Sequence, residues 1–337
     1  MAEIQDLDVS AFIALILIQT SNLRRLSFST AHGNMDDITI WQKVGKLQTE
    51  RKVSYLPGRL KELRIEYVLD WCYPSFGDVE DLYLPFIKDL DVFHVGPLYR
   101  GDPPKIGPGS LNISNLKLQV SQPGNIIIDF IKGCKALRSF EYRVVEDDGG
   151  LFPPGHLRSL LRAHAHCLEE FTGFFGVSYV EEPQVESDEK NPRYGSFADF
   201  VYLKRMDVEG CLINRLRRAE FPPALEMYTV RTEGDYHRDI STLLNSSRDA
   251  GFPPLKMNVI AETRTDGNTF EQWEKNPDRE CRALVEMLRG TRISVRLVVT
   301  SGYHGTAEHL VFADADGYRR EADVEIDTQR LSDPDGF

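Results

Sequence analysis

The feature that most constrains the fold is a short motif, Leu-x-x-Leu-x-Leu, that recurs along the chain with other apolar residues at its leucine positions. The first residue leads into a strand, the fourth and sixth face a core, and the residues between them face outward. The best-formed copy ends the stretch 152–171, FPPGHLRSLLRAHAHCLEEF, in which an apolar row at helical spacing precedes the strand. A helix followed by a strand, repeated, is typical of a leucine-rich-repeat solenoid.

The copies are unevenly spaced. Their first positions are Leu23, Leu60, Ile87, Ile113, Leu137, Leu168, Leu203 and Leu225, and a degenerate copy begins at Val79. Neighbouring full copies are separated by as few as 22 residues (Leu203 to Leu225) and as many as 37 (Leu23 to Leu60). Regular leucine-rich repeats have about 20 to 29 residues. The sequence therefore predicts an α/β fold, an irregular solenoid with a curved parallel sheet on the concave side and helices and turns on the convex side.

Two segments before strands have helical signals. Asn125 to Lys135 ends near Gly133, which we expect to adopt a left-handed helix cap, and Asp239 to Ala250 begins at a capping aspartate. An aromatic residue and a proline also precede several predicted strands, and proline favours the passage from helix to extended chain. They stand at Tyr55-Leu-Pro57, Tyr83-Leu-Pro85, Phe221-Pro-Pro223 and Phe252-Pro-Pro254.

The pattern changes near the C-terminus. From Pro277 we expect a longer helix that ends at Gly290, then an apolar strand over Ile293 to Val299 and a last strand over Leu310 to Phe312. Terminal repeats must cover an otherwise open core. We therefore predict one domain, with a repeat array over 1–300 and a C-terminal cap with an acidic tail over 301–337.

Composition limits the possible partners. The net charge is −12, and no cluster of Lys and Arg is present, so nucleic acid is not expected to bind. Five scattered cysteines without a C-x-x-C pair favour a reducing compartment, cytoplasmic or nuclear. The apolar run Ala11 to Ile18 has acidic rather than basic residues before it and is too short for a membrane span. We interpret it as one face of a first helix and expect no membrane association.

Two clusters could carry chemistry. His164, His166 and Cys167 contain zinc-ligand types, but no second ligand cluster accompanies them, and their position predicts a turn between helix and strand. His304, His309 and Asp314 leave open a hydrolase or transferase site in the C-terminal region. No nucleophile elbow and no phosphate-binding glycine loop is present. We therefore expect no catalytic residues, no metal and no cofactor.

The outward positions of neighbouring strands form one extended surface in a solenoid, and this concave face is the predicted binding site for a protein partner. Aromatic and arginine side chains supply much of the affinity at protein interfaces, and the predicted surface has both. Phe93 and Phe174 are its expected exposed aromatics. The candidate partner-binding residues are Arg64, Glu66, Asp91, Phe93, Lys117, Glu141, Arg143, Phe174, Asp207, Glu209 and Arg231.

Four segments carry a resemblance to a known family: FPPGHLRSLLRAHAHCLEEF, LPGRLKELRI, CKALRSFEYR and YLKRMDVEGC. They resemble the repeat regions of fungal F-box and leucine-rich-repeat proteins, over about residues 12 to 300. The resemblance implies a repeat fold and a role like that of substrate receptors in cullin-type ubiquitin ligases. In that family F-box helices bind the ligase adaptor and the repeats bind the substrate.

The chain departs from the family plan at its start. An F-box is expected before the repeats, but the first repeat strand is already complete at Phe28. Adaptor binding is therefore expected only if an F-box lies upstream. The sequence predicts a non-catalytic protein-recognition module, with a stand-alone scaffold as the first alternative and the C-terminal hydrolase or transferase as the second.

Overall fold

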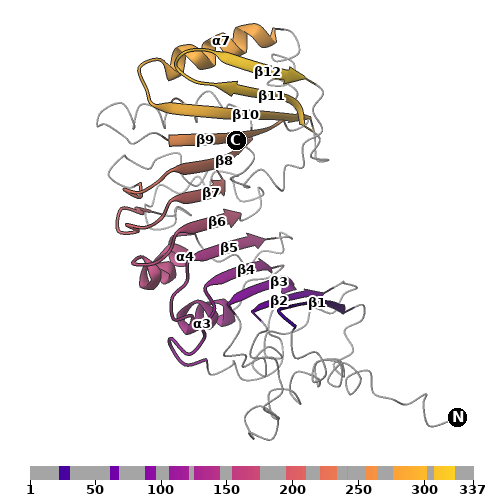
Figure 1. Ribbon diagram of the computed structural model, residues 1–337, viewed down its shortest axis with the longest axis vertical. Coiled ribbons are helices and arrows are strands. Elements are labelled where there is room, and N and C mark those ends of the chain that lie inside the picture. The colour runs from indigo at the N-terminus through magenta and orange to yellow at the C-terminus, as the bar shows by residue number, and fades with distance from the viewer. Residues whose placement is uncertain are drawn as a thin grey trace, which may run out of the picture. The chain divides into compact units, whose positions relative to one another are not determined.

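The computed structural model describes residues 23–30, 61–67, 88–95, 106–120, 125–144, 154–174, 195–209, 221–233, 241, 255–263, 276–301 and 307–322. Over these residues the protein is an α/β structure with mostly parallel strands and few helices (Figure 1). The predicted class, α/β with parallel strands, is confirmed. The degenerate copy at Val79 and the expected first helix over Ala11 to Ile18 lie outside the described residues, as does nearly all of the helix expected over Asp239 to Ala250.

The chain divides into two compact units, which we describe separately. Unit 1 comprises residues 1–152, 159–164 and 175–179, and unit 2 comprises 153–158, 165–174 and 180–337. The predicted arrangement, one array over 1–300 with a cap over 301–337, stays a prediction.

Five parallel strands, which follow one another in chain order, form the sheet of unit 1 (Figure 1). They are β1 (Arg25–Thr30), β2 (Glu62–Tyr67), β3 (Asp89–Val95), β4 (Asn115–Val120) and β5 (Ser139–Val144). Each begins two residues after the first position of a motif copy, as Leu23 and Arg25 illustrate. The motif thus locates these strands correctly.

In unit 2 the first three strands, β6 to β8, also begin two residues after the first position of a motif copy. Its strands are β6 (Glu170–Phe174), β7 (Arg205–Glu209), β8 (Met227–Glu233), β9 (Leu255–Thr263), β10 (Ile293–Ser301), β11 (Ala307–Ala313) and β12 (Tyr318–Ala322). Strands β6 to β10 are parallel, and β11 and β12 are antiparallel. Two residues before β9 and β10 stand Pro253 and Thr291, where strands β1 to β8 have leucine or isoleucine. The leucine motif therefore does not predict these two strands.

The strands of each unit pair in one register. In unit 1 the fourth motif positions lie opposite one another, as Leu63 does with Leu90 and Leu116 with Phe140. The same backbone contact also recurs at strand starts: the N–H of Glu62 donates to the carbonyl of Arg24 over 3.1 Å. In unit 2 the N–H of Met227 donates to the carbonyl of Lys204 in the same way, over 2.9 Å. In both cases the first residue of one strand bonds to the residue that immediately precedes the neighbouring strand.

Helix α3 (Asn125–Gly133) contributes Ile127, Phe130 and Ile131 to the core of unit 1. The expected left-handed cap at Gly133 is wrong, because its φ is not among the positive values, which occur at other glycines. Close packing explains the glycine instead. A Cβ at Gly133 would lie 2.4 Å from Cγ2 of Ile106, which is far inside van der Waals contact.

The stretch 152–171 folds as predicted. Helix α4 (Pro154–Leu161) and the short 3₁₀ helix η4 (Arg162–His164) precede a turn that leads into β6. The apolar row predicted to face inward is buried: Leu157, Leu160, Leu161 and His164. The helical spacing of the apolar residues therefore correctly predicts the buried face of this segment.

The C-terminal part of unit 2 confirms the predicted helix and adds an unpredicted strand. Helix α7 (Pro277–Leu288) is capped by Asn276, whose Oδ1 accepts a hydrogen bond from the N–H of Arg279, and it packs on β11 and β12. A turn at Asp314 then reverses the chain into β12. The Oδ1 of this aspartate accepts hydrogen bonds from the N–H groups of Asp316 (2.8 Å) and Gly317 (3.0 Å). The Asp-Ala-Asp-Gly sequence is a turn signal, but it does not by itself predict the strand β12 that follows.

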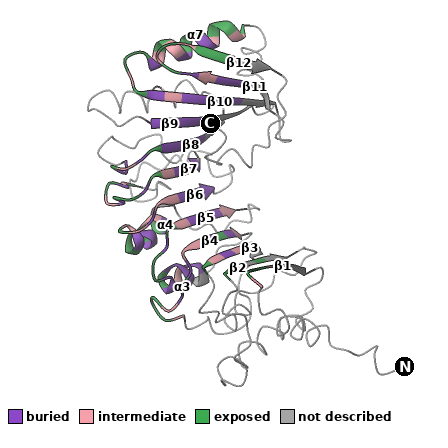
Figure 2. Cartoon of the chain, in the orientation of Figure 1, coloured by how far each residue is buried: buried purple, intermediate pink, exposed green. Residues whose placement is uncertain are grey.

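The two units differ in how their sheets are buried (Figure 2). In β5 of unit 1, burial alternates: Phe140 and Tyr142 are buried, whereas Glu141 and Arg143 are half-buried. In strands β7 to β10 of unit 2, described residues on both faces are buried. Strands buried on both faces are expected to carry near-continuous apolar runs. Polar residues in such strands therefore stand out.

Candidate functional site

A row of alternating charges runs across the sheet of unit 1. The register places Arg64 on β2 opposite Asp91 on β3, Asp91 opposite Lys117 on β4, and Lys117 opposite Glu141 on β5. We call these four residues the unit 1 charge row. All four lie at the outward fifth position of the motif, as predicted, and none of them is buried. Opposite charges directly across neighbouring strands contribute about 0.2–1 kcal/mol per pair.

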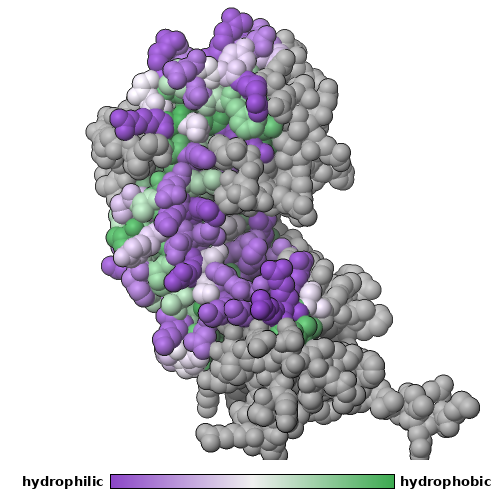
Figure 3. Space-filling view, viewed as in Figure 1, coloured by the Kyte–Doolittle hydropathy of each residue, from purple (hydrophilic) through white to green (hydrophobic). Residues whose placement is uncertain are grey.

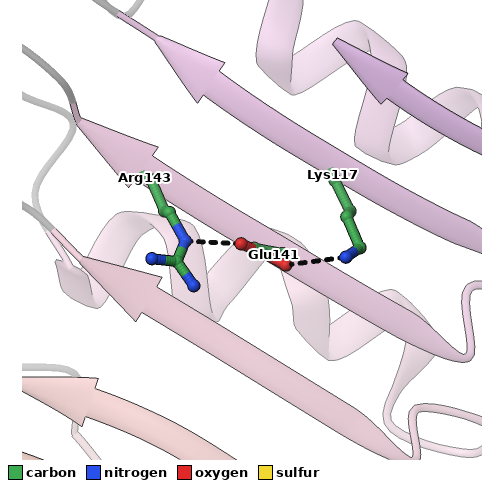
Figure 4. Close-up of polar contacts among 3 residues, drawn as sticks. All are labelled: Lys117, Glu141 and Arg143. Atoms are coloured by element: carbon green, nitrogen blue, oxygen red, sulfur yellow. Dashed lines mark hydrogen bonds and ion pairs between the residues drawn. The ribbon is translucent and has the colours of Figure 1, made fainter. Parts of the chain in front are cut away.

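Glu141 is held by two cations. Its Oε2 lies 3.4 Å from Nζ of Lys117, and its Oε1 accepts a hydrogen bond from Nε of Arg143 (Figure 4). The side chains of Glu141 and Arg143 are only 18% and 20% exposed, whereas that of Lys117 is 54% exposed. Partial burial reduces solvent screening, so the carboxylate is positioned more firmly than in an ordinary surface ion pair. In Figure 4 the three side chains stand on the side of the strands turned toward the viewer, with helical ribbon behind.

Two further polar pairs lie on the same face, two residues earlier in their strands than the charge row. The side-chain amide of Asn115 donates to the carboxylate of Asp89, and Nε of Arg25 lies 2.6 Å from the carboxylate of Glu62. Figure 3 shows that hydrophilic residues (purple) dominate the visible described surface, with smaller hydrophobic areas (green) between them. The outward face of unit 1 is therefore polar and organised by cross-strand pairs.

A different row crosses the sheet of unit 2, beginning at the fifth motif position of β7 and β8. Asp207 on β7, Thr229 on β8, Asn258 on β9 and Arg296 on β10 lie opposite one another in turn. We call them the unit 2 polar row. Their side chains are buried, with exposures of 5%, 2%, 1% and 8% respectively. Nδ2 of Asn258 donates to Oγ1 of Thr229 over 3.2 Å, which satisfies part of the buried polar surface.

Arg296 ends this row beside an aromatic ring. Its guanidinium lies 5.8 Å from the ring centroid of Phe312 on β11, and that of Arg319 on β12 lies 4.8 Å from the same centroid. The register also places Arg296 opposite Phe312 and Phe312 opposite Arg319. Burial lowers the pKa of Arg296, because desolvation penalises the charged form. Two cations therefore share one ring.

The structure tests several predicted site residues. Phe174 was expected to be a solvent-exposed aromatic, but its side chain is 8% exposed, so that expectation is wrong, and Asp207 is buried as well. The reason is that unit 2 is covered on both faces, which strand alternation alone cannot predict. The side chains of Glu66, Phe93, Glu209 and Arg231 lie outside the described residues.

Sequence reasoning missed Asn258, Arg296, Phe312 and Arg319 as candidate residues. A signal for one of them was present, since Arg296 is a lone charge in the apolar run 293–299. A charged residue in a strand that is otherwise apolar is seldom buried without a partner.

The H-x-H-C segment is a structural turn. His164 is buried; its Nε2 lies 2.8 Å from the carbonyl of Ile131, and its Nδ1 accepts a hydrogen bond from the N–H of Leu137 over 3.4 Å. The imidazole is thus a neutral bridge between two backbone segments, with its hydrogen on Nε2. His166 is exposed, and Cys167 is half-buried. Among the described residues, no group of His, Cys, Asp and Glu could hold a metal ion.

The alternative C-terminal site stays a prediction, because His304 lies outside the described residues and only the backbone of His309, on β11, is described. Its third residue, Asp314, is exposed, and its carboxylate accepts hydrogen bonds from the turn backbone. Two other titratable groups are structural. Burial raises the pKa of Cys134 to about 12 and raises that of Tyr142 above its ordinary value. A buried thiol with a raised pKa is a poor nucleophile.

Comparisons with protein-family models, with curated proteins and with solved structures found no match to this chain. Within the residues that the structure describes, no helix has the length and apolar character needed to cross a membrane.

Proposed function

We propose that the chain is a non-catalytic protein-recognition module of the leucine-rich-repeat type. Its binding surface is the outward face of the unit 1 sheet, centred on the charge row and Arg143. The observation that carries this proposal is the fixed arrangement of Arg64, Asp91, Lys117 and Glu141, with Glu141 paired to cations on its own and the neighbouring strand.

The chemistry of this surface suits a protein partner rather than a small molecule or a nucleic acid. Alternating charges on neighbouring strands cancel over the row, so they give no general attraction for polyanions. They do impose a pattern that only a complementary surface can match, and such patterns provide specificity more than raw affinity. Parallel strands that lie side by side also give a broad surface of the kind that protein interfaces use.

The repeat fold supports this proposal independently of the charges. Eight strands begin two residues after a motif position, and the strand-start hydrogen bond recurs in both units. A recurring unit of this kind is compatible with an open α/β solenoid, whose usual role is to present an extended recognition surface. A role as the substrate receptor of a cullin-type ligase, in the cytoplasm or nucleus, would further require F-box helices upstream. Without them the chain would be a stand-alone scaffold.

The test compares two charge-neutralised variants. Arg64→Gln with Lys117→Gln removes both cations of the charge row, whereas Lys132→Gln with Lys135→Gln removes two exposed cations of unit 1 outside it. Each tagged full-length protein is used for quantitative affinity purification from cells. We expect a set of proteins to be enriched about fivefold or more by the wild type and the control but lost with the row variant. Equal enrichment by both variants would refute the proposed surface.

Stability must be matched before the comparison is made. Removal of the three cross-strand pairs of the row costs about 0.6–3 kcal/mol, which thermal unfolding would detect. If the row variant unfolds at the assay temperature, Glu141→Gln is used in its place. This single substitution removes one charge and keeps the size of the side chain. Loss of all enriched proteins from every variant, the control included, would also count against the proposal.

A further inference from the structure

The unit 1 charge row places unlike charges at a regular interval across the sheet. Its four residues lie on four neighbouring parallel strands, each directly opposite the next. Because paired strands lie about 4.8 Å apart, the second, third and fourth charges lie about 4.8, 9.6 and 14.4 Å from the first. A partner that uses the whole row must therefore repeat its own charges at the same interval.

The two cations of the row are its members most open to a partner. Arg64 and Lys117 are exposed, whereas Asp91 and Glu141 are half-buried. Nζ of Lys117 lies 3.4 Å from the carboxylate of Glu141, and the lysine side chain is 54% exposed, so its ammonium group can also donate to a second carboxylate. Two strand spacings, about 9.6 Å, separate the two exposed cations. We therefore expect a partner to offer two carboxylates at about that separation, with a residue that is not acidic between them, opposite Asp91.

The rest of the outward face of unit 1 has no excess of either charge among the described side chains. Two residues earlier in the strands, Glu62 pairs with Arg25, and Asp89 accepts a hydrogen bond from Asn115. A uniformly acidic or basic partner would meet as much repulsion as attraction on such a face, so the face favours a partner of alternating charge. The described charges on it are Arg25, Arg64, Lys117 and Arg143 and the carboxylates of Glu62, Asp89, Asp91 and Glu141.

An α-helix matches the interval of the row, and an extended chain does not. A helix rises about 1.5 Å per residue, so positions i+3, i+7 and i+10 lie about 4.5, 10.5 and 15 Å from position i along its axis, on the same side. Each of these distances agrees with the row to within about 1 Å. One face of a β-strand instead repeats about every 6.7 Å, so its second and third side chains would miss their partners by about 2 and 4 Å.

We propose that the unit 1 charge row binds an α-helix of a partner protein, which lies across the strands and carries acidic residues at i and i+7 and basic residues at i+3 and i+10. The two acidic residues face Arg64 and Lys117. The two basic residues face the half-buried carboxylates of Asp91 and Glu141. Each charge of the row keeps its neighbour on the sheet and gains a second partner of opposite sign. This inference rests on the proposed function, because it names the kind of partner that the unit 1 surface recognises.

The experiment measures fluorescence anisotropy of labelled alanine-based peptides of about 20 residues, titrated with the full-length protein at low salt. The matched peptide has Glu at i and i+7 and Lys at i+3 and i+10. A block peptide of the same composition has Glu at i and i+3 and Lys at i+7 and i+10, which favours the helix but removes the alternation. A strand-phased peptide alternates Glu and Lys at i, i+2, i+4 and i+6, and a fourth peptide has proline at the centre of the matched sequence. We expect the matched peptide to bind about fivefold or more tightly than each of the other three.

Variants of the protein locate the contact. Arg64→Gln and Lys117→Gln should each weaken binding of the matched peptide by about threefold to tenfold. Replacement of both peptide Glu residues by Gln should weaken binding to the wild type by a similar factor, but it should have less than about a twofold effect on the variant that lacks both cations. The control variant, Lys132→Gln with Lys135→Gln, should bind the matched peptide within about twofold of the wild type.

Equal binding of the matched and block peptides would exclude recognition of the alternation. Binding of the strand-phased or proline peptide as tight as that of the matched peptide would exclude the helix, and absence of saturable binding of the matched peptide would also overturn the inference. In each of these cases the proposed function stands if the variant without both cations still loses its enriched proteins in affinity purification. If that variant changes neither the peptide binding nor the enriched proteins, both the inference and the proposed function fail.

Discussion

Arg296→Met tests whether the buried guanidinium of unit 2 costs stability. Methionine keeps an unbranched stem of similar length and removes the charge, while Phe312 remains as a packing partner. We expect the variant to be as stable as the wild type or more stable, by up to about 4 kcal/mol, the range found when buried ion pairs are replaced by well-packed apolar residues. The reason is that the interactions available to Arg296 are too weak to offset its desolvation.

Two interactions offset part of the desolvation cost of Arg296. Asp207 is the opposite charge in the same row, three strands away, and three spacings of about 4.8 Å place it roughly 14 Å from Arg296. With an effective dielectric constant of about 20, Coulomb's law gives roughly 1.2 kcal/mol of attraction at that separation. The contact with the Phe312 ring adds about 0.5–2 kcal/mol. The sum, at most about 3 kcal/mol, is below the several kcal/mol that desolvation of one buried ion costs.

The assay is urea unfolding followed by far-UV circular dichroism for the wild type, Arg296→Met, Phe312→Leu and the double variant. The double-mutant cycle isolates the cation–ring contact, which we expect to contribute about 0.5–2 kcal/mol of coupling. Because burial lowers the pKa of Arg296, the folded state binds the proton more weakly, and stability rises with pH only near that high pKa. The effect of Arg296→Met should therefore be constant between about pH 5 and 9. A loss of more than about 2 kcal/mol in Arg296→Met, or a coupling near zero, would refute the reasoning.

Three further predictions concern unit 1. His164→Ala should lower the free energy of unfolding by about 2–5 kcal/mol in urea titrations, because two buried backbone groups lose their partner, whereas His166→Ala should have almost no effect. Gly133→Ala should cost about 1–3 kcal/mol, since its Cβ would lie 2.4 Å from Ile106, and Gly317→Ala, with open space around it, is the control for thermal unfolding. Cys134 should resist iodoacetamide at pH 8 until the protein is unfolded, as mass spectrometry of the alkylated peptide would show. Its pKa of about 12 also means that its stabilising contribution declines as pH rises above about 8.5, the value in the unfolded chain.

The strands of the array were predictable because their signal is local. A strand in a solenoid must bury the fourth and sixth motif residues and expose the fifth, and this alternation is written in the sequence, as in Phe140, Glu141 and Tyr142. Where the first motif position carries another residue type, the same signal is lost. Pro253 precedes β9 and Thr291 precedes β10, so only the general apolar character of these strands was visible.

Other features depend on parts of the chain that are distant in sequence. Gly133 reads as a helix cap from its position, but its role is set by Ile106, which lies 27 residues earlier. The burial of Phe174 also depends on distant parts of the chain. Strand alternation predicts which face of the sheet a residue occupies, but it does not predict whether that face is covered. The turn at Asp314 was visible in the sequence, but whether a strand follows a turn depends on the pairing that β11 provides.

The unit 1 charge row and the unit 2 polar row illustrate how burial selects residue type. In unit 1 the row is exposed or half-buried, and charges alternate from Arg64 to Glu141, so each pair is partly neutralised by its neighbour. In unit 2 the row is buried, and its two central positions are neutral. Asn258 and Thr229 can donate and accept hydrogen bonds without carrying a charge into the interior, and they do so with each other.

Arg296 departs from that rule, and the departure is informative. A neutral residue would satisfy the packing of β10 at lower cost, as the flanking Val295 and Leu297 show on the opposite face. Proteins tolerate an expensive buried charge most readily where binding or catalysis uses it.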